Sequence, residues 1–278
     1  MKDFQGKVVA ITGAASGLGA ATARAFAARG ARLSLCDIDG EGLRGMKSEL
    51  EGRGSEVFTE VVDVAQAWQV EEFCENTYKA MGQVDVLVNN AGVACAGTLA
   101  DMELEDWQWI VGINFWGVIH GTHFFYPRMV QRGSGHIVNI SSAAGLAPLP
   151  LLAAYCGTKS AILAMTRVWR AEAAPHNVGF TAVCPGFMTT NISKSVRTCT
   201  GTRRKTPEEY GQWVDRFFQR GNFDPARTAE MLVKAVEKDK GIVRGGFETK
   251  FTDTMNRISR TFSDFVLRVG VRLNQRWV

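Results

Sequence analysis

A tyrosine and a lysine four residues apart, Tyr155 and Lys159, have the residue types and the spacing for proton transfer. On a helix, side chains at positions i and i+4 lie on one face, about 5–6 Å apart. An ammonium group at that distance favours the phenolate form, so we expect Lys159 to lower the pKa of Tyr155 from its reference value of about 10. A phenol with a pKa nearer neutrality can act as a general acid or base. Because this spacing is common by chance, the pair taken alone indicates only a helix-surface contact.

A glycine-rich segment follows the first apolar run and leads directly into a helix of small residues. Gly13 permits a tight turn, Gly17 lets backbone N–H groups approach a pyrophosphate, and Gly19 lets the helix lie close to a sheet. The spacing is G-x-x-x-G-x-G rather than G-x-G-x-x-G, and three glycines alone also fit a turn that binds nothing. Their position between the first strand and the first helix favours a nucleotide cofactor.

Asp37 ends the second predicted strand, 18 residues after Gly19. A carboxylate at this position accepts hydrogen bonds from both ribose hydroxyls of an adenosine and repels a 2′-phosphate. Ala14, Ala15 and Ile38 supply no cation that could bind such a phosphate. We therefore expect NAD rather than NADP as the cofactor. The alternative is that Asp37 merely caps the helix that follows, a role that Asp39 could fill instead.

The elements that position these residues alternate between short apolar runs and longer helical stretches, which is typical of βαβ units and a parallel sheet. The predicted strands are Val8–Thr12, Arg32–Cys36, Glu56–Val62, Val84–Asn89, His136–Ser141, Gly179–Cys184 and Gly241–Arg244. The predicted helices lie near Leu18–Arg29, Glu41–Glu51, Gln66–Met81, Leu104–Gln131, Ala154–Ala174 and Thr228–Lys238. The stretch 191–207 is the one long irregular region, and a loop of that length is usually functional or mobile.

Composition and charge exclude several classes of protein. The chain has 278 residues, 46% of them apolar and 22% charged, as in a soluble globular protein. From Lys250 onward there are six Lys or Arg against two Asp, whereas the other 249 residues carry 26 charges of each sign. Because these 249 residues have no net charge, there is no reason to expect that they bind nucleic acid. There is no secretory signal, no 18-residue apolar run and no C-x-x-C pair among six cysteines. We expect a cytoplasmic protein with reduced thiols and no metal site.

In combination these motifs resemble the short-chain dehydrogenase/reductase family, from Lys7 to about Gly246. The resemblance implies a Rossmann-type, doubly wound α/β fold with a seven-stranded, mostly parallel sheet flanked by helices. It also implies an NAD(H)-dependent oxidoreductase that interconverts a secondary alcohol and a ketone, and a homodimer or homotetramer. The cofactor-binding residues that it implies are Gly13, Ser16, Gly17, Leu18, Gly19, Asp37, Asp63, Val64, Asn90, Ala91, Gly92, Tyr155, Lys159, Pro185, Gly186 and Thr190.

The same resemblance implies a catalytic tetrad of Asn114, Ser142, Tyr155 and Lys159. Ser142 is preferred to Ser141 because it stands 13 residues before Tyr155, as in the family. In this assignment Tyr155 exchanges the hydroxyl proton and Ser142 hydrogen-bonds the substrate oxygen. Lys159 binds the nicotinamide ribose, and Asn114 holds a water that links Lys159 to solvent.

The substrate is expected to be apolar and fairly bulky (steroid-like, aromatic or alicyclic), because the segments that line the site in relatives are rich in leucine and aromatic residues here. The predicted substrate-binding residues are Ser142, Leu149, Tyr155 and Phe187. Further lining is expected from Leu146, Leu151, Leu152, Met188, Trp213, Phe217 and Phe218. Two alternatives stay open: an NAD-binding scaffold or sensor without turnover, and a membrane-surface-associated member of the family that acts on lipid-like substrates.

We predict a catalytic domain over residues 1–247, with a substrate-side segment at 187–225, followed by a basic amphipathic helical extension over 248–278. Apolar residues recur there at steps of three and four, namely Phe251, Met255, Ile258, Phe262, Phe265, Val269, Leu273 and Trp277. Such a stripe predicts one helix face that is buried against its own domain, a second subunit or an anionic membrane. We favour a protein contact. Many relatives instead end in a short tail that helps to build a tetramer, so the extension puts that assembly in doubt.

Overall fold

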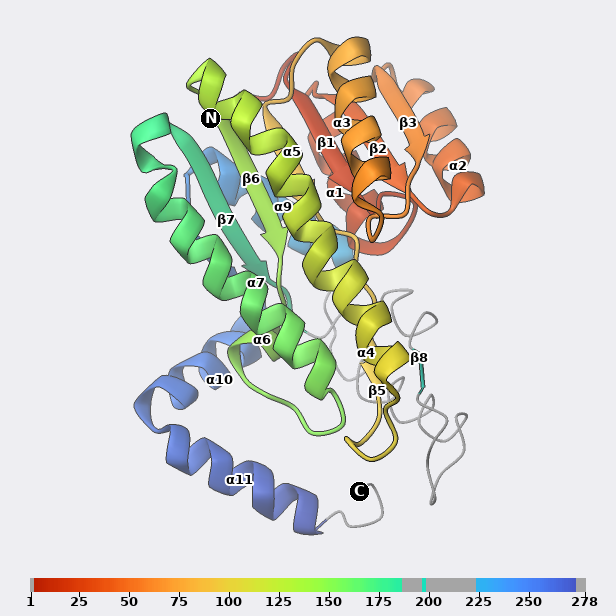
Figure 1. Cartoon of the computed structure of the whole chain (residues 1–278). Helices are drawn as coiled ribbons and strands as arrows, with labels where there is room; N and C mark the ends of the chain where they lie inside the picture. Colours follow the sequence, from red (N-terminus) through yellow and green to blue (C-terminus); the bar gives the residue numbers. More distant parts are fainter. Residues whose placement is uncertain (1–2, 187–196, 199–223, 274–278) are drawn as a thin grey trace.

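The computed structural model describes residues 3–186, 197–198 and 224–273 (Figure 1). Within that part of the chain, seven strands form one sheet in the order β3-β2-β1-β4-β6-β7-β9, and each neighbouring pair is parallel. The strands are β1 Val8–Thr12, β2 Arg32–Asp37, β3 Val57–Val61, β4 Val86–Asn89, β6 Gly135–Ile140, β7 Val178–Cys184 and β9 Ile242–Arg244. The strand order reverses between β1 and β4, and ligands of such sheets bind outside the carboxyl ends of the strands at this point. The predicted doubly wound α/β fold is confirmed.

Helices cover both faces of the sheet (Figure 1). One face packs against α1 Gly17–Ala27, α2 Gly40–Glu51 and α9 Pro225–Glu237, and the other against α3 Ala67–Met81, α5 Gly117–Arg132 and α7 Ala153–Glu172. All five residues of β1 are buried, as a strand covered on both faces requires. A separate apolar cluster lies beyond the carboxyl edge of the sheet and includes Tyr155 and Leu152.

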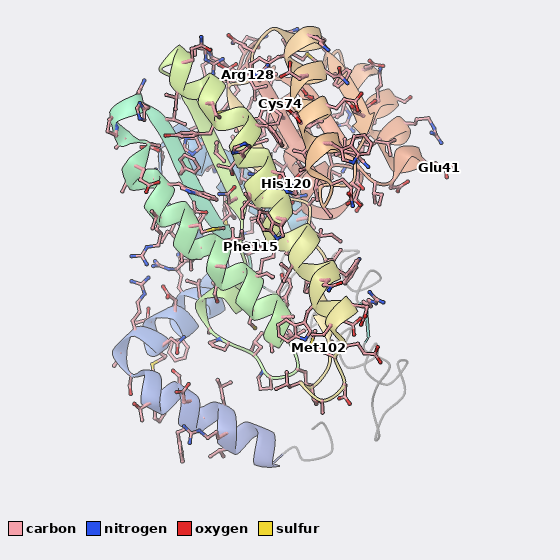
Figure 2. The ribbon with its side chains drawn as sticks, in the orientation of Figure 1. Glu41, Cys74, Met102, Phe115, His120 and Arg128 are labelled. Atoms are coloured by element: carbon pink, nitrogen blue, oxygen red, sulfur yellow. The ribbon has the colours of Figure 1, made fainter. Side chains whose placement is uncertain are left out.

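The prediction of a single helix over 104–131 is wrong in one respect, because a π-helical turn separates two α-helices there. α4 covers Leu104–Val111, the π-helical turn covers Gly112–Trp116, and α5 follows. In the turn, the Gly117 N–H donates to the Gly112 carbonyl, five residues back. Such turns are frequent at functional sites, and Asn114 lies inside this one. Figure 2 shows Phe115 and His120 along this run, and His120 Nδ1 donates to the Val64 carbonyl at 2.9 Å.

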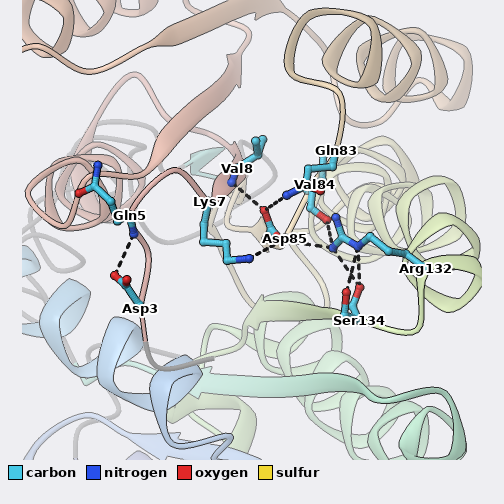
Figure 3. Close-up of polar contacts among 9 residues, drawn as sticks. All are labelled: Asp3, Gln5, Lys7, Val8, Gln83, Val84, Asp85, Arg132 and Ser134. Carbon is cyan, nitrogen blue, oxygen red and sulfur yellow. Dashed lines mark hydrogen bonds and ion pairs between the residues drawn. The ribbon is translucent and has the colours of Figure 1, made fainter.

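A buried carboxylate ties the strands together at the amino end of the sheet, opposite the predicted site (Figure 3). Asp85 precedes β4 and accepts hydrogen bonds from the Val8 N–H and from Gln83 Nε2, both at 2.9 Å. Lys7 and Arg132 each form an ion pair with it at 3.5 Å. The network joins β1, β4 and the end of α5, and it holds in register the two strands whose far ends flank the site.

Two short strands were not predicted. β5 (Cys95–Ala96) pairs in parallel with β8 (Arg197–Thr198). The Arg197 guanidinium lies 3.1 Å from the buried carboxylate of Asp106 on α4 and 5.6 Å from the centre of the Trp109 ring. These contacts attach residues 197–198 to the wall of the apolar cluster.

The C-terminal extension forms two helices, so the prediction of one continuous helix is wrong. α10 covers Gly246–Ile258 and α11 covers Arg260–Leu273. Ser259 between them is extended, with φ −153° and ψ 102°, and its hydroxyl accepts a hydrogen bond from the Phe262 N–H at 3.1 Å. Serine is a favoured N-cap residue, which explains why a new helix starts here. No helix of the described residues is long and apolar enough to cross a membrane.

The first helix of this extension belongs to the body of the molecule. Asn256 Nδ2 donates to the Leu146 carbonyl at 2.8 Å, which attaches α10 to the short helix α6 (Ala143–Leu146). The buried carboxylate of Asp253 lies 2.6 Å from the Arg244 guanidinium on β9 and 3.0 Å from that of Arg257. The predicted boundary at residue 247 therefore falls inside α10, a helix that packs on the domain.

Candidate active site

The glycine-rich loop lies directly against the segment that follows β4. A side chain at Gly19 would place its Cβ 2.0 Å from the Gly13 carbonyl oxygen, and one at Gly13 would lie 2.7 Å from the Ala91 Cα. Gly13 also has a φ of +66°, a conformation that L side chains rarely adopt. Asn90 Nδ2 donates to the Thr12 and Gly13 carbonyls at 3.0 and 2.9 Å. Glycine is therefore required here by space as well as by backbone conformation.

Thr12 is a site residue that the sequence reasoning missed. Its side-chain oxygen accepts hydrogen bonds from the N–H groups of Asn90 and Ala91, at 3.0 and 3.1 Å. It thereby fixes the end of β1 to the end of β4. The available signal was a polar residue that closes an otherwise apolar strand. The Asn90 side-chain amide and the Ala91 N–H are thus both hydrogen-bonded within the chain, so their predicted contacts with a cofactor stay a prediction.

Asp37 lies beside the loop rather than at the start of α2. Its carboxylate accepts hydrogen bonds from the Ala15 N–H at 2.9 Å and from the Asp39 N–H at 3.1 Å. Asp39 caps α2, accepting from the N–H groups of Glu41 and Gly42. The alternative that Asp37 caps this helix is therefore wrong.

The end of β3 completes this side of the site. Asp63 Oδ1 accepts a hydrogen bond from the Ala65 N–H at 3.0 Å, which fixes the turn before α3. Val64 is buried, and a side chain at Gly117 would lie 2.8 Å from its methyl carbon. Three features on this side of the site suit a dinucleotide. They are the glycine turn, the Asp37 carboxylate and the amino end of α1, where the Ser16 hydroxyl makes no capping hydrogen bond.

The structure brings Ser142, Tyr155 and Lys159 together at the carboxyl edge of the sheet. Ser142 follows β6 and begins α6, while Tyr155 and Lys159 lie one turn apart on α7. The Ser142 hydroxyl faces the Tyr155 phenol closely enough to lower its pKa, and Lys159 Nζ lies 5.8 Å from the centre of the Tyr155 ring. The neighbouring Ser141 hydroxyl instead donates to the Lys159 carbonyl at 2.7 Å. The geometry thus agrees with the choice of Ser142 over Ser141.

The expectation that Lys159 lowers the pKa of Tyr155 is wrong for this structure. Burial raises the pKa of Tyr155 to about 12, and the hydrogen bond from Ser142 offsets only part of that rise. Burial also lowers the pKa of Lys159 from 10.5 to about 8. Removal from water disfavours the charged form of each group more than their proximity favours it. The pair is consequently held toward a neutral phenol and an easily deprotonated amine.

Asn114 lies near Lys159, but its side-chain amide forms hydrogen bonds with other residues of the chain. A Cβ at Gly92 would lie 3.2 Å from both Asn114 Oδ1 and Lys159 Nζ. The amide accepts from the Val93 N–H at 2.8 Å and donates to the Val93 carbonyl at 2.9 Å and to Thr158 Oγ1 at 3.3 Å. Asn114 is fully buried. The side-chain amide is thus hydrogen-bonded within the chain, and the water contact predicted for Asn114 stays a prediction.

The substrate side of the site is only partly described. Leu149 is half-buried in the same apolar cluster as Tyr155, and its N–H lies 3.4 Å from Cys156 Sγ. At the end of β7, the Pro185 carbonyl accepts from the Ala143 N–H at 2.8 Å, and a side chain at Gly245 would lie 2.8 Å from the Gly186 nitrogen. The predicted residues Phe187 and Thr190 lie outside the described residues, as do Met188, Trp213, Phe217 and Phe218. Among the residues that the structure describes, no group of three His, Cys, Asp or Glu could hold a metal ion.

Comparison with known proteins agrees with this geometry. The family profile described as "short chain dehydrogenase" matches residues 7–200, which include every described member of the predicted tetrad. The chain belongs to the short-chain dehydrogenase family. EphD of Mycobacterium tuberculosis is 37% identical over 241 residues, covering 86% of this chain. That match covers 41% of EphD, so the chain spans less than half the length of this relative.

Two further relatives add to this comparison. One is similar over nearly the whole chain, and the other was crystallised with NAD. SadH of Mycobacterium tuberculosis is 33% identical over 273 residues, which is 98% of this chain and 97% of SadH, so the similarity extends into the C-terminal helices. The crystal structure of a short-chain dehydrogenase/reductase from Burkholderia phymatum in complex with NAD superposes with a TM-score of 0.80 at 32% identity, covering 87% of this chain and 90% of that one.

Proposed function

We propose that this chain is an NAD(H)-dependent oxidoreductase that interconverts a secondary alcohol and a ketone. The observation that carries the proposal is the grouping of Ser142, the buried Tyr155 and the buried Lys159, whose ammonium lies 5.8 Å from the centre of the Tyr155 ring, at the carboxyl edge of the sheet. A fold shared by many chemistries does not by itself define an activity, so the proposal depends on this constellation.

NAD is proposed as the cofactor because of the residues around the loop. Gly13 and Gly19 let the loop pack directly against the end of β4, where any side chain would collide with the backbone, and the Asp37 carboxylate borders the loop through the Ala15 N–H. A carboxylate here favours a free ribose 2′-hydroxyl over a 2′-phosphate. When bound, the nicotinamide would supply or accept the hydride. The Burkholderia relative crystallised with NAD is consistent with this assignment.

In the proposed mechanism Tyr155 is the general acid and base. Because burial raises its pKa to about 12, the phenol is protonated at neutral pH and suited to donate its proton to a ketone oxygen. As hydride reaches the carbonyl carbon, the proton leaves Tyr155 Oη, and the Ser142 hydroxyl donates a hydrogen bond to the same substrate oxygen. Lys159, with a pKa of about 8, is the nearest ammonium that could stabilise the phenolate left behind. Alcohol oxidation would follow these steps in reverse.

A bulky apolar substrate is proposed from the walls of the site. Leu152 belongs to the apolar cluster that contains Tyr155, and Val93, Leu149 and Trp109 pack against this cluster. Pockets of this kind hold ligands mainly through apolar contact, while a few polar groups set the orientation. Ser142 and Tyr155 would be those polar groups here.

The test is a screen of NADH formation over secondary alcohols, from small polyols to steroids, with the reverse reaction over the matching ketones. Ser142→Ala should lower turnover by roughly 100-fold or more, since it removes a donor to the reacting oxygen. Ser160→Ala is the matched control, because this hydroxyl on α7 donates to the Gly145 carbonyl instead. Turnover of polyols in preference to apolar alcohols would refute the substrate class, and NADH binding without any turnover would favour the scaffold alternative.

A further inference from the structure

α11 presents an apolar face that the described part of the chain leaves uncovered. Phe262, Phe265 and Val266 are 51%, 61% and 51% exposed, and Ile258 at the end of α10 is 73% exposed. Single exposed apolar side chains are ordinary, but several on adjoining turns form a patch of the kind that marks an interaction site. Of the predicted stripe, Ile258, Phe262 and Phe265 are therefore not buried against their own domain; Val266 was not part of that prediction.

Apolar side chains of α11 lie on one side of the helix axis, with a cation at the border of that side. At 100° per residue, Phe262, Phe265, Val266 and Val269 fall on one side, and Arg268 falls at the border of that side. Arg257 on α10 is exposed as well. A narrow apolar face bordered by cations is typical of helices that lie in the plane of a membrane interface.

The position of α11 connects this face to the proposed site. Figure 1 shows α10 and α11 at the end of the molecule that carries α6 and β5, beyond the carboxyl edge of the sheet. α10 holds α6 through the bond from Asn256 to the Leu146 carbonyl, and α6 begins at Ser142. A surface that engages α11 would accordingly lie at the same end of the molecule as Ser142.

Charge decides between a second copy of the chain and a lipid surface. The segment from Lys250 onward carries six cations and two anions, and the rest of the chain is neutral. A symmetric contact between two copies would bring two such positive segments together, and the rest of the chain, with 26 charges of each sign, has no net negative charge to attract the segment. An anionic lipid surface complements both the apolar face and the cations.

We propose that α11 binds an anionic lipid surface. Phe262, Phe265 and Val266 enter the boundary between headgroups and acyl chains, and Arg268 faces the lipid phosphates. The proposal does not depend on the proposed activity. If both hold, the enzyme takes apolar substrate at the membrane surface.

The test is flotation of the full chain with vesicles of phosphatidylglycerol and phosphatidylcholine, and with vesicles of phosphatidylcholine alone. We expect partition onto the anionic vesicles that weakens as salt is added. The double variant Phe262→Ser, Phe265→Ser should lower it by at least roughly tenfold, because half-exposed aromatic area no longer enters the lipid. Arg268→Gln should lower it about fivefold.

Two matched controls separate the proposed face from exposed residues in general. Leu104→Ser removes another exposed large apolar side chain, and Arg167→Gln removes an exposed cation of α7. Both should partition like the unaltered protein. Circular dichroism and the urea midpoint establish that all four variants are folded.

Three results would overturn the proposal. The unaltered protein might fail to float with anionic vesicles, it might float equally with phosphatidylcholine alone, or the double variant might float as well as the unaltered protein. Light scattering in lipid-free buffer gives a further measure. A dimer that Phe262→Ser, Phe265→Ser converts to a monomer, with no flotation of either protein, would assign the face to a second copy instead.

Discussion

Replacing Lys159 by methionine should stabilise the folded chain at neutral pH while abolishing its proposed activity. Lys159 is only 3% exposed, and its ammonium donates to the Ile140 carbonyl at 3.0 Å. Among the described residues no carboxylate forms an ion pair with it. A buried cation without a partner costs the fold stability, and methionine fills a similar volume without the charge.

The size of the effect follows from the lowered pKa of Lys159. A fall from 10.5 to about 8 corresponds to roughly 3 kcal/mol against the charged form in the folded state. Methionine removes this cost but also removes the charged hydrogen bond to the Ile140 carbonyl, worth about 1.5–3 kcal/mol. We therefore expect Lys159→Met to raise the free energy of unfolding by up to about 1.5 kcal/mol near neutral pH.

The pH dependence of the stability difference shows whether the buried charge of Lys159 is its cause. Below about pH 8 the lysine is charged in both states, so the folded protein carries the full cost. Between about pH 8 and 10.5 the folded state has already released its proton while the unfolded state retains it, so the unaltered protein recovers stability as pH rises. The advantage of Lys159→Met should shrink over this range. Tyr155 is present in both proteins, so its own raised pKa contributes equally to both.

The assay is urea unfolding of both proteins near pH 7 and near pH 10, with Lys79→Met as the control at an exposed position of α3. The control should change the free energy of unfolding by no more than about 0.5 kcal/mol at either pH. The reasoning is refuted if Lys159→Met is less stable than the unaltered protein at neutral pH. It is equally refuted if the difference between the two proteins does not change with pH.

Three other changes have expected outcomes. Asp37→Ala should narrow the preference for NAD over NADP, expected to be at least about tenfold in kcat/KM, and equal kcat/KM for both cofactors in the unaltered enzyme would contradict the assignment. Gly19→Ala should abolish NADH binding measured by calorimetry, since its Cβ would lie 2.0 Å from the Gly13 oxygen. Deleting α11 from residue 260 should leave the urea midpoint unchanged, whereas deletion from residue 246 should cause aggregation or loss of substrate affinity, because it frees the Leu146 carbonyl and uncovers α6. Equal behaviour of the two deletions in light scattering and kinetics would be the contrary result.

The parts of the fold that the sequence predicted well depend on local pattern. β1 has the predicted bounds, Val8–Thr12, because a wholly apolar run followed by a glycine turn is typical of a strand buried on both faces. The spacing to Tyr155 that the family resemblance implies selects Ser142 over its neighbour, and this selection stays a prediction. These features are set by residues close in sequence and by a motif with fixed spacing.

Other features depend on contacts distant in sequence, or on details of backbone hydrogen bonding that periodicity does not register. The π-turn around Asn114 shifts a helix by one residue without changing its apolar pattern. The pairing of β5 with β8 joins segments about a hundred residues apart. The pKa of Tyr155 depends on how deeply the ring is buried, which no spacing reveals.

The helix break at Ser259 had a local signal that the regular stripe concealed. Apolar residues recur at steps of three and four on both sides of Ser259, so the stripe predicts one helix where there are two. A serine three residues before Phe262 is a possible N-cap, and its hydroxyl does cap α11. Whether that stripe would be buried could not be read from the pattern, because periodicity shows that a face exists and not what covers it.

The most direct measurement of the central claim separates chemistry from cofactor binding at Tyr155. Tyr155→Phe keeps the ring but removes the transferable proton, and Tyr126→Phe is the control at a tyrosine whose ring packs 5.6 Å from Phe180, away from the site. With an alcohol found by the NAD screen, Tyr155→Phe should lose about 100-fold or more in kcat, while NADH affinity measured by fluorescence stays within about twofold. Retention of more than a few per cent of the activity by Tyr155→Phe would contradict the assignment of this residue as the general acid and base.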